Sequence, residues 1–228
     1  MTAFRIGALT TATRLRSERT PIVLGLSVLI VALFAYLERR AGGTGAVDRA
    51  LTRDSFGILL PLVSYLTFQR ATQGGRLDSS ARTVARHGAN GQSVWLGAAL
   101  PPILTLVLLG MTFAVVTVSV AHGRADPGLL RDLWQSTWIG ALAGTAYGAW
   151  FALASDFGRF GAGRKWMLLF DLLLGGTSGS LAMPWPRAHI QNLLGAEPLL
   201  GLGQGTALAV LLVSTLSVLL VALRRAPG

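Results

Sequence analysis

Six stretches of the chain are almost wholly apolar, and segments rich in charge, glycine and proline separate them. A helix needs about 20 apolar residues to cross a hydrocarbon layer of roughly 30 Å. The second stretch reaches this length only with Ser55 and residues 69–72. We include it because a helix that ended inside the lipid would leave backbone N–H and C=O groups without hydrogen-bond partners. The pattern therefore predicts six membrane-spanning helices, over residues 21–37, 55–72, 94–121, 137–155, 166–183 and 202–223.

The segment before the first span, residues 2–17, predicts a helix that lies on the membrane surface. It contains no proline, and it has four apolar residues on one side: Phe4, Ala8, Ala12 and Leu15. An amphipathic segment of this kind is typical of an interfacial helix. A disordered basic arm is the alternative.

Residues 76–87 predict a short amphipathic helix between the second and third spans. Its apolar residues recur at helical spacing and are Leu77, Ala81 and Val84. Its polar face consists of Ser79, Arg82, Thr83 and Arg86. This shape fits a docking element for a cytoplasmic partner, and it fits equally well a loop that arginines hold at anionic headgroups.

Residues 184–200, before the last span, predict an outer re-entrant element. Pro184-Trp185-Pro186 breaks the helix at membrane depth, an apolar-rich helical run follows, and Pro198 interrupts the chain again. Tryptophan favours the depth of the membrane interface. We therefore expect a turn and a short helix here, and an all-α polytopic membrane fold for residues 1–228 as a single domain.

Composition supports a membrane protein and excludes several other classes. Hydrophobic residues make up 52% of the 228 residues and charged ones only 13%, too few for a large water-facing surface. Intrinsic disorder requires low hydrophobicity and is excluded. The sequence contains no cysteine, which excludes disulfide scaffolds, cysteine-ligated metals and cysteine nucleophiles.

The net charge of +10 follows from topology. With the N-terminus inside, 13 of the 20 basic residues lie in inner segments, in agreement with the positive-inside rule. These are Arg5, Arg14, Arg16, Arg19, Arg70, Arg76, Arg82, Arg86, Arg159, Arg164, Lys165, Arg224 and Arg225. We expect both termini in the cytoplasm, a bacterial-type cytoplasmic (inner) membrane, membrane lipid as a partner, and no nucleic acid.

Glycines recur at four-residue spacing in and around the last three spans. They are Gly140, Gly144 and Gly148, Gly175 and Gly179, and Gly201 and Gly205. Rows of this kind allow helix backbones to approach closely in lipid. They predict packing inside one bundle, with a subunit interface as the alternative.

Sequence motifs of catalysis are weak in this chain. Gly176-Thr177-Ser178-Gly179 has the form found in rhomboid intramembrane proteases, but the histidine that follows, His189, lies outside the spans, so this is a remote alternative. Residues 158–165 imitate a phosphate-binding loop without its lysine and hydroxyl residue in place. His87, His122 and His189 fall in separate loops. We expect no catalytic residue, no metal and no cofactor in this chain.

The order of these elements resembles that of the permease subunits of type-two ABC exporters, over essentially the whole chain. In that family the outer element often reads Leu-Pro-x-Trp-Leu-x, with Asn-Pro-Leu about ten residues on. Here Met183-Pro184-Trp185-Pro186 is followed by Glu197-Pro198-Leu199. Residues 76–87 occupy the position of the family's coupling helix but lack its common Glu-Arg-Glu lead-in.

The resemblance implies a transport subunit without catalysis. Two permeases, identical or sister chains, would form the translocation path between them, and a separate cytoplasmic ATPase would bind ATP and magnesium. The residues expected to contact the ATPase are Ser79, Arg82, Thr83, Arg86 and His87. A non-transporting membrane scaffold or assembly subunit is the alternative.

Polar groups inside the spans are the candidates for lining the path, because they are costly against lipid. They are Tyr65, Asp171, Thr177, Ser178 and Gln204. Asp171 is the one acid within a predicted span. It either lines the path or forms a structural pair with a basic neighbour such as Arg164 or Lys165.

Overall fold

The computed structural model describes residues 2–17, 19–42, 45–88, 90–123, 126, 128–177, 179–197 and 199–226, and across these ranges it contains helices and no strand. The prediction of an all-α fold is confirmed. The longer helices are α1 (Ala3–Leu15), α2 (Arg19–Ala41), α4 (Leu60–Ala71), α6 (Gly91–Ala121), α7 (Leu129–Ala154), α8 (Gly163–Leu174) and α10 (Gln204–Arg225). The shorter elements are α3 (Ala46–Arg49), the π-helix η1 (Ala50–Leu59), α5 (Asp78–Ala85), η2 (Arg159–Gly161), η3 (Ser180–Ala182), α9 (Pro186–Leu193) and η4 (Leu199–Gly201).

Three of the helices in the described ranges, α2, α6 and α10, are long and apolar enough to cross a membrane. Their apolar side chains lie largely on the surface of the bundle. Leu29 of α2, Leu108 of α6 and Leu216 of α10 are 60–67% exposed. A soluble protein would bury such side chains, so the chain is best understood as a membrane protein.

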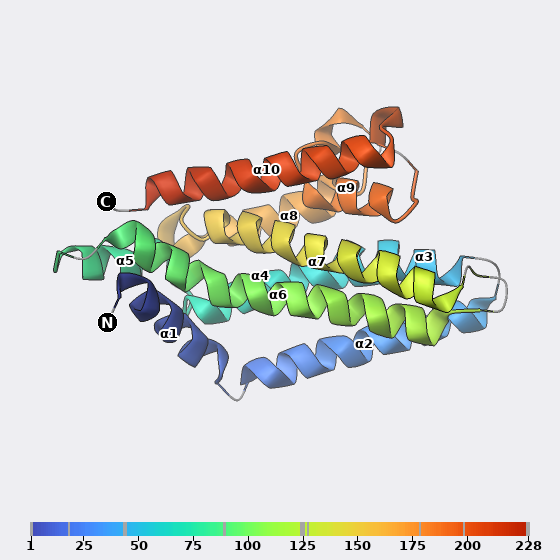
Figure 1. The fold of residues 1–228 in the computed structure, drawn as a ribbon, viewed down its shortest axis with the longest axis horizontal. Helices are drawn as coiled ribbons and strands as arrows, with labels where there is room; N and C mark the ends of the chain where they lie inside the picture. The colour runs from blue at the N-terminus through green and yellow to red at the C-terminus, as the bar shows by residue number, and fades with distance from the viewer. Residues whose placement is uncertain are drawn as a thin grey trace.

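The helices form an elongated bundle in which α6 and α7 run side by side along the long axis (Figure 1). α2 packs against α6, and α10 packs against α7. α1 crosses one end of α6, where α5 and both chain ends also lie, and we call this the α5 end (Figure 1). α3 and α9 lie at the opposite end, which we call the α9 end (Figure 1).

α6 and α7 approach each other at glycines. A Cβ atom built at Gly140 would lie 2.8 Å from the carbonyl carbon of Gly110, and one at Gly144 would lie 2.6 Å from that of Leu106. Real Cβ atoms do not come this close, so only glycine permits the backbone contact. The prediction that this row packs inside the bundle is confirmed for Gly140, Gly144 and Gly148, which lies against Ile103.

A second pair of glycines holds α1 on α6. A Cβ atom at Gly7 would lie 2.8 Å from the backbone nitrogen of Ala98, and one at Gly97 would lie 3.0 Å from that of Ala8. The two backbones therefore touch, and α1 is part of the packed bundle.

The predicted span 55–72 is not one regular α-helix. Its first part belongs to the π-helix η1, which passes directly into α4. A Cβ atom at Gly57 would lie 2.5 Å from the carbonyl oxygen of Thr52, and the same oxygen accepts a hydrogen bond of 3.1 Å from the Gln191 side chain of α9. The π-helix has a wide turn here, and Gly57 has no side chain to obstruct it. The carbonyl oxygen of Thr52 can therefore reach α9.

The predicted helix over 166–183 is wrong in its extent. α8 ends at Leu174, and its 12 residues span only about 18 Å. Gly175 and Gly176 follow, and Arg187 of α9 fills the space beside them: a Cβ atom at Gly175 would lie 2.9 Å from its Cβ. The chain then continues through a turn and the short helix η3.

Replacing Gly144 by alanine tests the α6–α7 contact. Gly144→Ala should lower the stability of the purified protein by about 1–3 kcal/mol, because its Cβ would overlap the backbone of α6. Thermal unfolding in detergent measures the loss. The matched control is Gly205→Ala, because the described residues place no atom within 4 Å of a Cβ there. An equal loss in both variants would contradict this account of the packing.

Candidate docking site at the α5 end

α5 is amphipathic in the way its sequence predicts. Leu77 and Ala81 are buried in the bundle, and Val84 is half-buried against the same core. The apolar face therefore seats the helix on its neighbours. The opposite face points away from the bundle.

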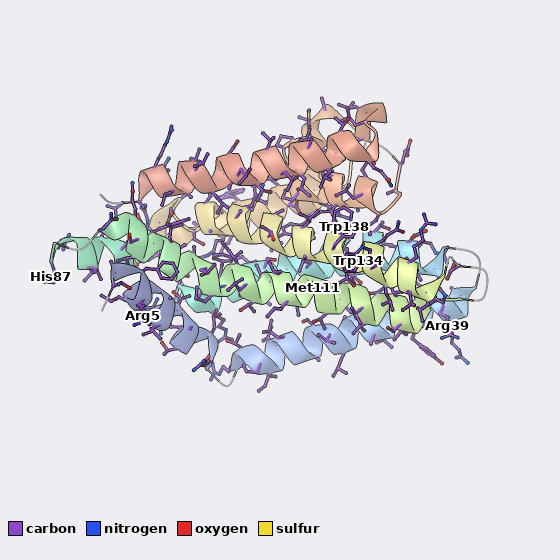
Figure 2. All side chains as sticks on the ribbon, viewed as in Figure 1. Arg5, Arg39, His87, Met111, Trp134 and Trp138 are labelled. Atoms are coloured by element: carbon purple, nitrogen blue, oxygen red, sulfur yellow. The ribbon has the colours of Figure 1, made fainter. Side chains whose placement is uncertain are left out.

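All five residues predicted to contact a partner lie on this outer face and are exposed. They are Ser79, Arg82, Thr83, Arg86 and His87. The two hydroxyls donate to backbone carbonyls of the same segment, Ser79 to Arg76 at 2.7 Å and Thr83 to Ser79 at 3.1 Å. Arg86 and His87 follow at the C-terminal end of the helix. Figure 2 labels His87 at the tip of this end of the molecule.

Asp78, the first residue of α5, belongs to this candidate site, and the sequence interpretation did not include it. It is buried, and its carboxylate accepts hydrogen bonds from Arg76 at 2.8 Å and from Arg82, four residues on, at 2.8 Å. The two arginine side chains remain partly exposed. Arg82 is therefore held in one position on the outer face, which leaves Arg86 as the basic side chain without this constraint from Asp78.

Asp156 ties the start of α5 to the bundle. It lies beyond the C-terminal end of α7 and is 3% exposed. One carboxylate oxygen accepts the backbone N–H of Asp78 at 2.9 Å, and the other accepts the indole N–H of Trp95 at 2.8 Å. Trp95 belongs to α6 and is wholly buried. α5, α6 and the α7–α8 connection therefore meet at one carboxylate.

Burial raises the pKa of Asp156 to about 6, and the neighbouring carboxylate of Asp78 adds to the rise. The hydrogen bond from Trp95 opposes it. Burial has the larger effect because a carboxylate loses more solvation than two neutral N–H donors restore.

Arg164 holds the segment that leads into α5. It is 1% exposed at the start of α8, and one guanidinium nitrogen donates to the hydroxyl of Thr72 at 2.8 Å and to the carbonyl oxygen of Gly75 at 2.9 Å. The other donates to the side-chain oxygen of Gln69 at 3.0 Å. Arg164 thus joins α8 to the end of α4 and to the turn before α5. The prediction that it pairs with Asp171 is wrong, because both terminal guanidinium nitrogens donate to these other partners.

Asp171 is wholly buried in α8 and has other partners. It accepts the hydroxyl of Tyr147 on α7 at 2.9 Å and the backbone N–H of Arg187 on α9 at 3.4 Å. The Arg187 side chain donates to the carbonyl oxygen of Leu172 at 3.1 Å. Neither Arg164 nor Lys165 forms the predicted pair, and the contacts of Asp171 hold α7, α8 and α9 together.

The other residues predicted to line a path lie apart. Tyr65 is half-buried on α4, and Thr177 lines a pocket of about 250 Å³ with Arg187 and Gln191. Gln204 lines a different pocket, of about 240 Å³, with Asp48 and Asp132. Ser178 lies outside the described residues. Thr177 and Gln204 therefore line different pockets.

The three histidines do not meet. His189 is buried in α9 with its Nε2 2.7 Å from the carbonyl oxygen of Met183, and His122 lies 3.7 Å from Asp132. The described part of the chain contains no group of three or more side chains that could hold a metal ion.

Comparison with known proteins adds no further assignment. No family model matches the chain, and no match is found among the curated proteins or the solved structures. The geometry at the α5 end therefore carries the functional argument.

The raised pKa of Asp156 predicts a pH-dependent stability. An unfolded aspartate has a pKa near 4, so the folded chain keeps a proton that the unfolded chain has lost between about pH 4 and pH 6. The contribution of Asp156 to stability is full below about pH 4 and is lost as the pH rises through about 6.

We expect the wild-type protein to lose more stability between about pH 5 and pH 7.5 than Asp156→Asn, whose side chain does not titrate. Thermal unfolding in detergent at the two pH values measures this difference. Glu197→Gln, at an exposed carboxyl near α9, should keep the wild-type pH dependence. The same pH dependence in wild type and Asp156→Asn would show that Asp156 does not titrate in this range.

Proposed function

We propose that the chain is the membrane-spanning subunit of an ATP-driven transporter, an exporter of the type-two ABC kind, and that α5 is the docking helix for a separate ATPase. The observation that carries the proposal is the construction of α5. Its outer face is polar and basic, and its first residue is bonded through Asp156 to Trp95 of α6. An exposed face on a firmly anchored short helix suits the transfer of movement into a bundle.

The proposed topology has six membrane passages. α2, α6 and α10 are three of them, and α7 is a fourth. η1 with α4 forms a further passage, and so does α8 with the segment up to residue 183. The α5 end faces the cytoplasm and the α9 end faces outward, since the inner segments then carry most of the basic residues. α1 lies at the cytoplasmic surface, and α9 forms the outer element.

Two copies, or one copy and a sister chain, would enclose the translocation path, with Tyr65, Thr177, Ser178 and Gln204 as its candidate polar lining. Asp171 is wholly buried between helices and is not part of this lining. ATP and magnesium belong to the ATPase. ATP drives transport only if the ATPase binds the two conformations of the permease with different free energies. Movement of α5 would reach α6 through Asp156 and Trp95, and the Arg164 contacts would carry it to α8.

Reporter fusions test the orientation. A reporter fused after Gly88, at the end of α5, should be cytoplasmic, and one fused after Gly123, beyond α6, should be external. The inner segments hold most of the arginine, which disfavours their translocation. Alkaline phosphatase activity and green fluorescence report the two sides. The opposite pattern would overturn the orientation.

Charge reversal on the outer face of α5 tests the docking role. Arg86→Glu should reduce the amount of ATPase that co-purifies with the tagged chain, because a basic contact becomes a repulsive one. The measurement is mass spectrometry of the proteins that the tagged chain retains from its native membrane. We choose Arg86 because Asp78 already binds Arg82.

Arg16→Glu is the matched control, with the same charge change on an exposed residue at the end of α1. It should leave co-purification unchanged. If the wild-type chain retains no ATPase with a phosphate-binding loop, the transport proposal fails and a scaffold or assembly subunit becomes the better account. If it retains one and Arg86→Glu does not reduce it, the docking role of α5 fails.

A further inference from the structure

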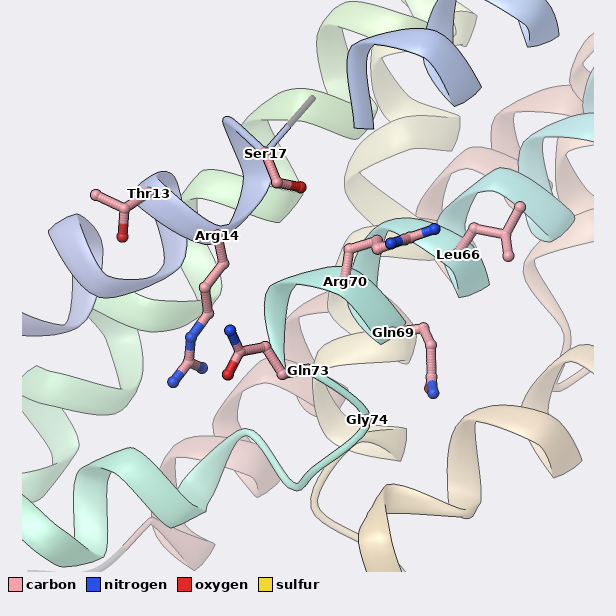
Figure 3. Close-up of a pocket in the computed structure, with 8 residues that line it drawn as sticks. All are labelled: Thr13, Arg14, Ser17, Leu66, Gln69, Arg70, Gln73 and Gly74. Carbon is pink, nitrogen blue, oxygen red and sulfur yellow. The ribbon is translucent and has the colours of Figure 1, made fainter. Parts of the chain in front are cut away.

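A basic pocket lies between the end of α1 and the end of α4, beside the docking helix but separate from its outer face. Its volume is about 730 Å³. Its long polar side chains are those of Arg14, Gln69, Arg70 and Gln73. In Figure 3 those of Arg14 and Gln73 lie next to each other, and those of Gln69 and Arg70 extend away from this pair. None of the described residues that line it is acidic. The lining therefore offers hydrogen-bond donors and positive charge to an anion.

Two side chains of this pocket, Arg14 and Gln69, are held in place by hydrogen bonds. Arg14 donates to the carbonyl oxygen of Ala71 at 3.2 Å, which fixes its guanidinium beside the end of α4. The Gln69 side-chain oxygen is bound by Arg164 at 3.0 Å, so its amide nitrogen remains as a donor. Gln73 follows α4 with a left-handed φ of 51°, and its side chain reaches toward that of Arg14 (Figure 3).

Two smaller pockets follow the basic pocket along α2, and together we call them the apolar groove. The first, of only about 30 Å³ and lined by Val23, Leu24 and Thr67, shares Leu66 and Arg70 with the basic pocket. The second, of about 310 Å³, shares Leu24 and extends between α2 and α6 past Val28. Leu24 and Val28 are four residues apart on one face of α2, so the groove follows the helix axis.

The basic pocket and the apolar groove together form a site that is polar at one end and apolar at the other. Arginines and amides form one end, and aliphatic side chains of two helices that are apolar enough to cross a membrane form the other. A free phosphate would use only the polar end. A phospholipid with a net negative charge would use both, with its phosphate at the arginines and one acyl chain along α2.

We propose that the pocket between α1 and α4, together with the groove along α2, is a binding site for one anionic phospholipid. The bound lipid would join α1, α2 and α4 at the membrane surface. The site does not depend on the proposed transport function, because it requires only that α2 and α6 lie in the membrane.

Native mass spectrometry of the full chain in detergent tests the site with three added probes: palmitoyl-oleoyl phosphatidylglycerol, the corresponding phosphatidylcholine, and inorganic phosphate. One phosphatidylglycerol should be retained in preference to phosphatidylcholine. Arg70→Gln should weaken its binding about fivefold, since an arginine near the surface contributes about 1 kcal/mol. Arg14→Gln should act in the same direction. Arg16→Gln, on an exposed residue outside the pocket, should leave binding unchanged.

Three results would overturn the proposal. The first is an equal loss of binding in Arg16→Gln and Arg70→Gln, which would indicate general surface attraction. The second is displacement of the lipid by inorganic phosphate at equal concentration, which would indicate a free-anion site. The third is equal affinity for dihexanoyl and palmitoyl-oleoyl phosphatidylglycerol, which would leave the apolar groove without a role. Arg70 is exposed, so Arg70→Gln keeps the test valid if Arg14→Gln does not fold.

Discussion

The backbones of α6 and α7 touch at glycine, and the rest of the bundle is attached to this pair. Helices in lipid gain little from the hydrophobic effect, so close packing and hydrogen bonds must hold them together. Gly110, Gly140 and Gly144 allow the backbones of α6 and α7 to come into contact. α1 and α2 then add to α6, and α4 and α10 add to α7. α1 packs on α6 in the same way, with backbone contacts at Gly7 and Gly97.

Polar contacts at the α5 end depend on that central pair. Trp95 lies at the start of α6 and Asp156 just beyond the end of α7, so the close contact of the two helices brings their side chains together. A buried carboxylate is costly unless donors surround it, and here two N–H groups do so. Arg164 meets the same requirement with oxygens of the α4–α5 connection. The turn before α5 is therefore fixed from two sides.

The sequence predicted what depends on local pattern. Apolar runs located α2, α6 and α10, and helical spacing located the buried and exposed faces of α5. The extent of α8 was wrong because Gly175-Gly176 was counted as part of an apolar run, although the pair ends the helix and makes room for Arg187.

The partners of the buried charges could not be found from the sequence. Asp156 and Trp95 are 61 residues apart, and Arg164 and Thr72 are 92 apart. Such contacts depend on the approach of helices that no local pattern specifies. A basic residue near Asp171 in the sequence suggested an ion pair, but the hydroxyl of Tyr147 from another helix binds the carboxylate. The sequence contained one signal for the burial of Asp156, because this acid directly follows an apolar span.

The same arrangement holds a short helix at each end of the bundle. Asp156 accepts a backbone N–H from the first residue of α5 and an indole N–H from α6. Asp171 accepts a backbone N–H from the second residue of α9 and a phenol hydroxyl from α7. In both places a carboxylate lies at the N-terminus of the short helix, where free N–H groups and the helix dipole favour negative charge. An aromatic donor from a long helix completes each site.

Anchoring by the N-terminus has a consequence for movement. At α5 the contact is confined to the first turn, and the apolar face seats the remainder of the helix on the bundle. α9 has further polar contacts along its length, such as the hydrogen bond from Gln191 to the carbonyl oxygen of Thr52. The anchors differ in geometry: the backbone hydrogen bond is 2.9 Å at α5 and 3.4 Å at α9. At the α5 end the contacts of Arg164 add a second fixed point, at the turn before α5. In the proposed function, a force applied to the exposed face of α5 would pass to α6 through Asp156 and Trp95, and to α8 through Arg164.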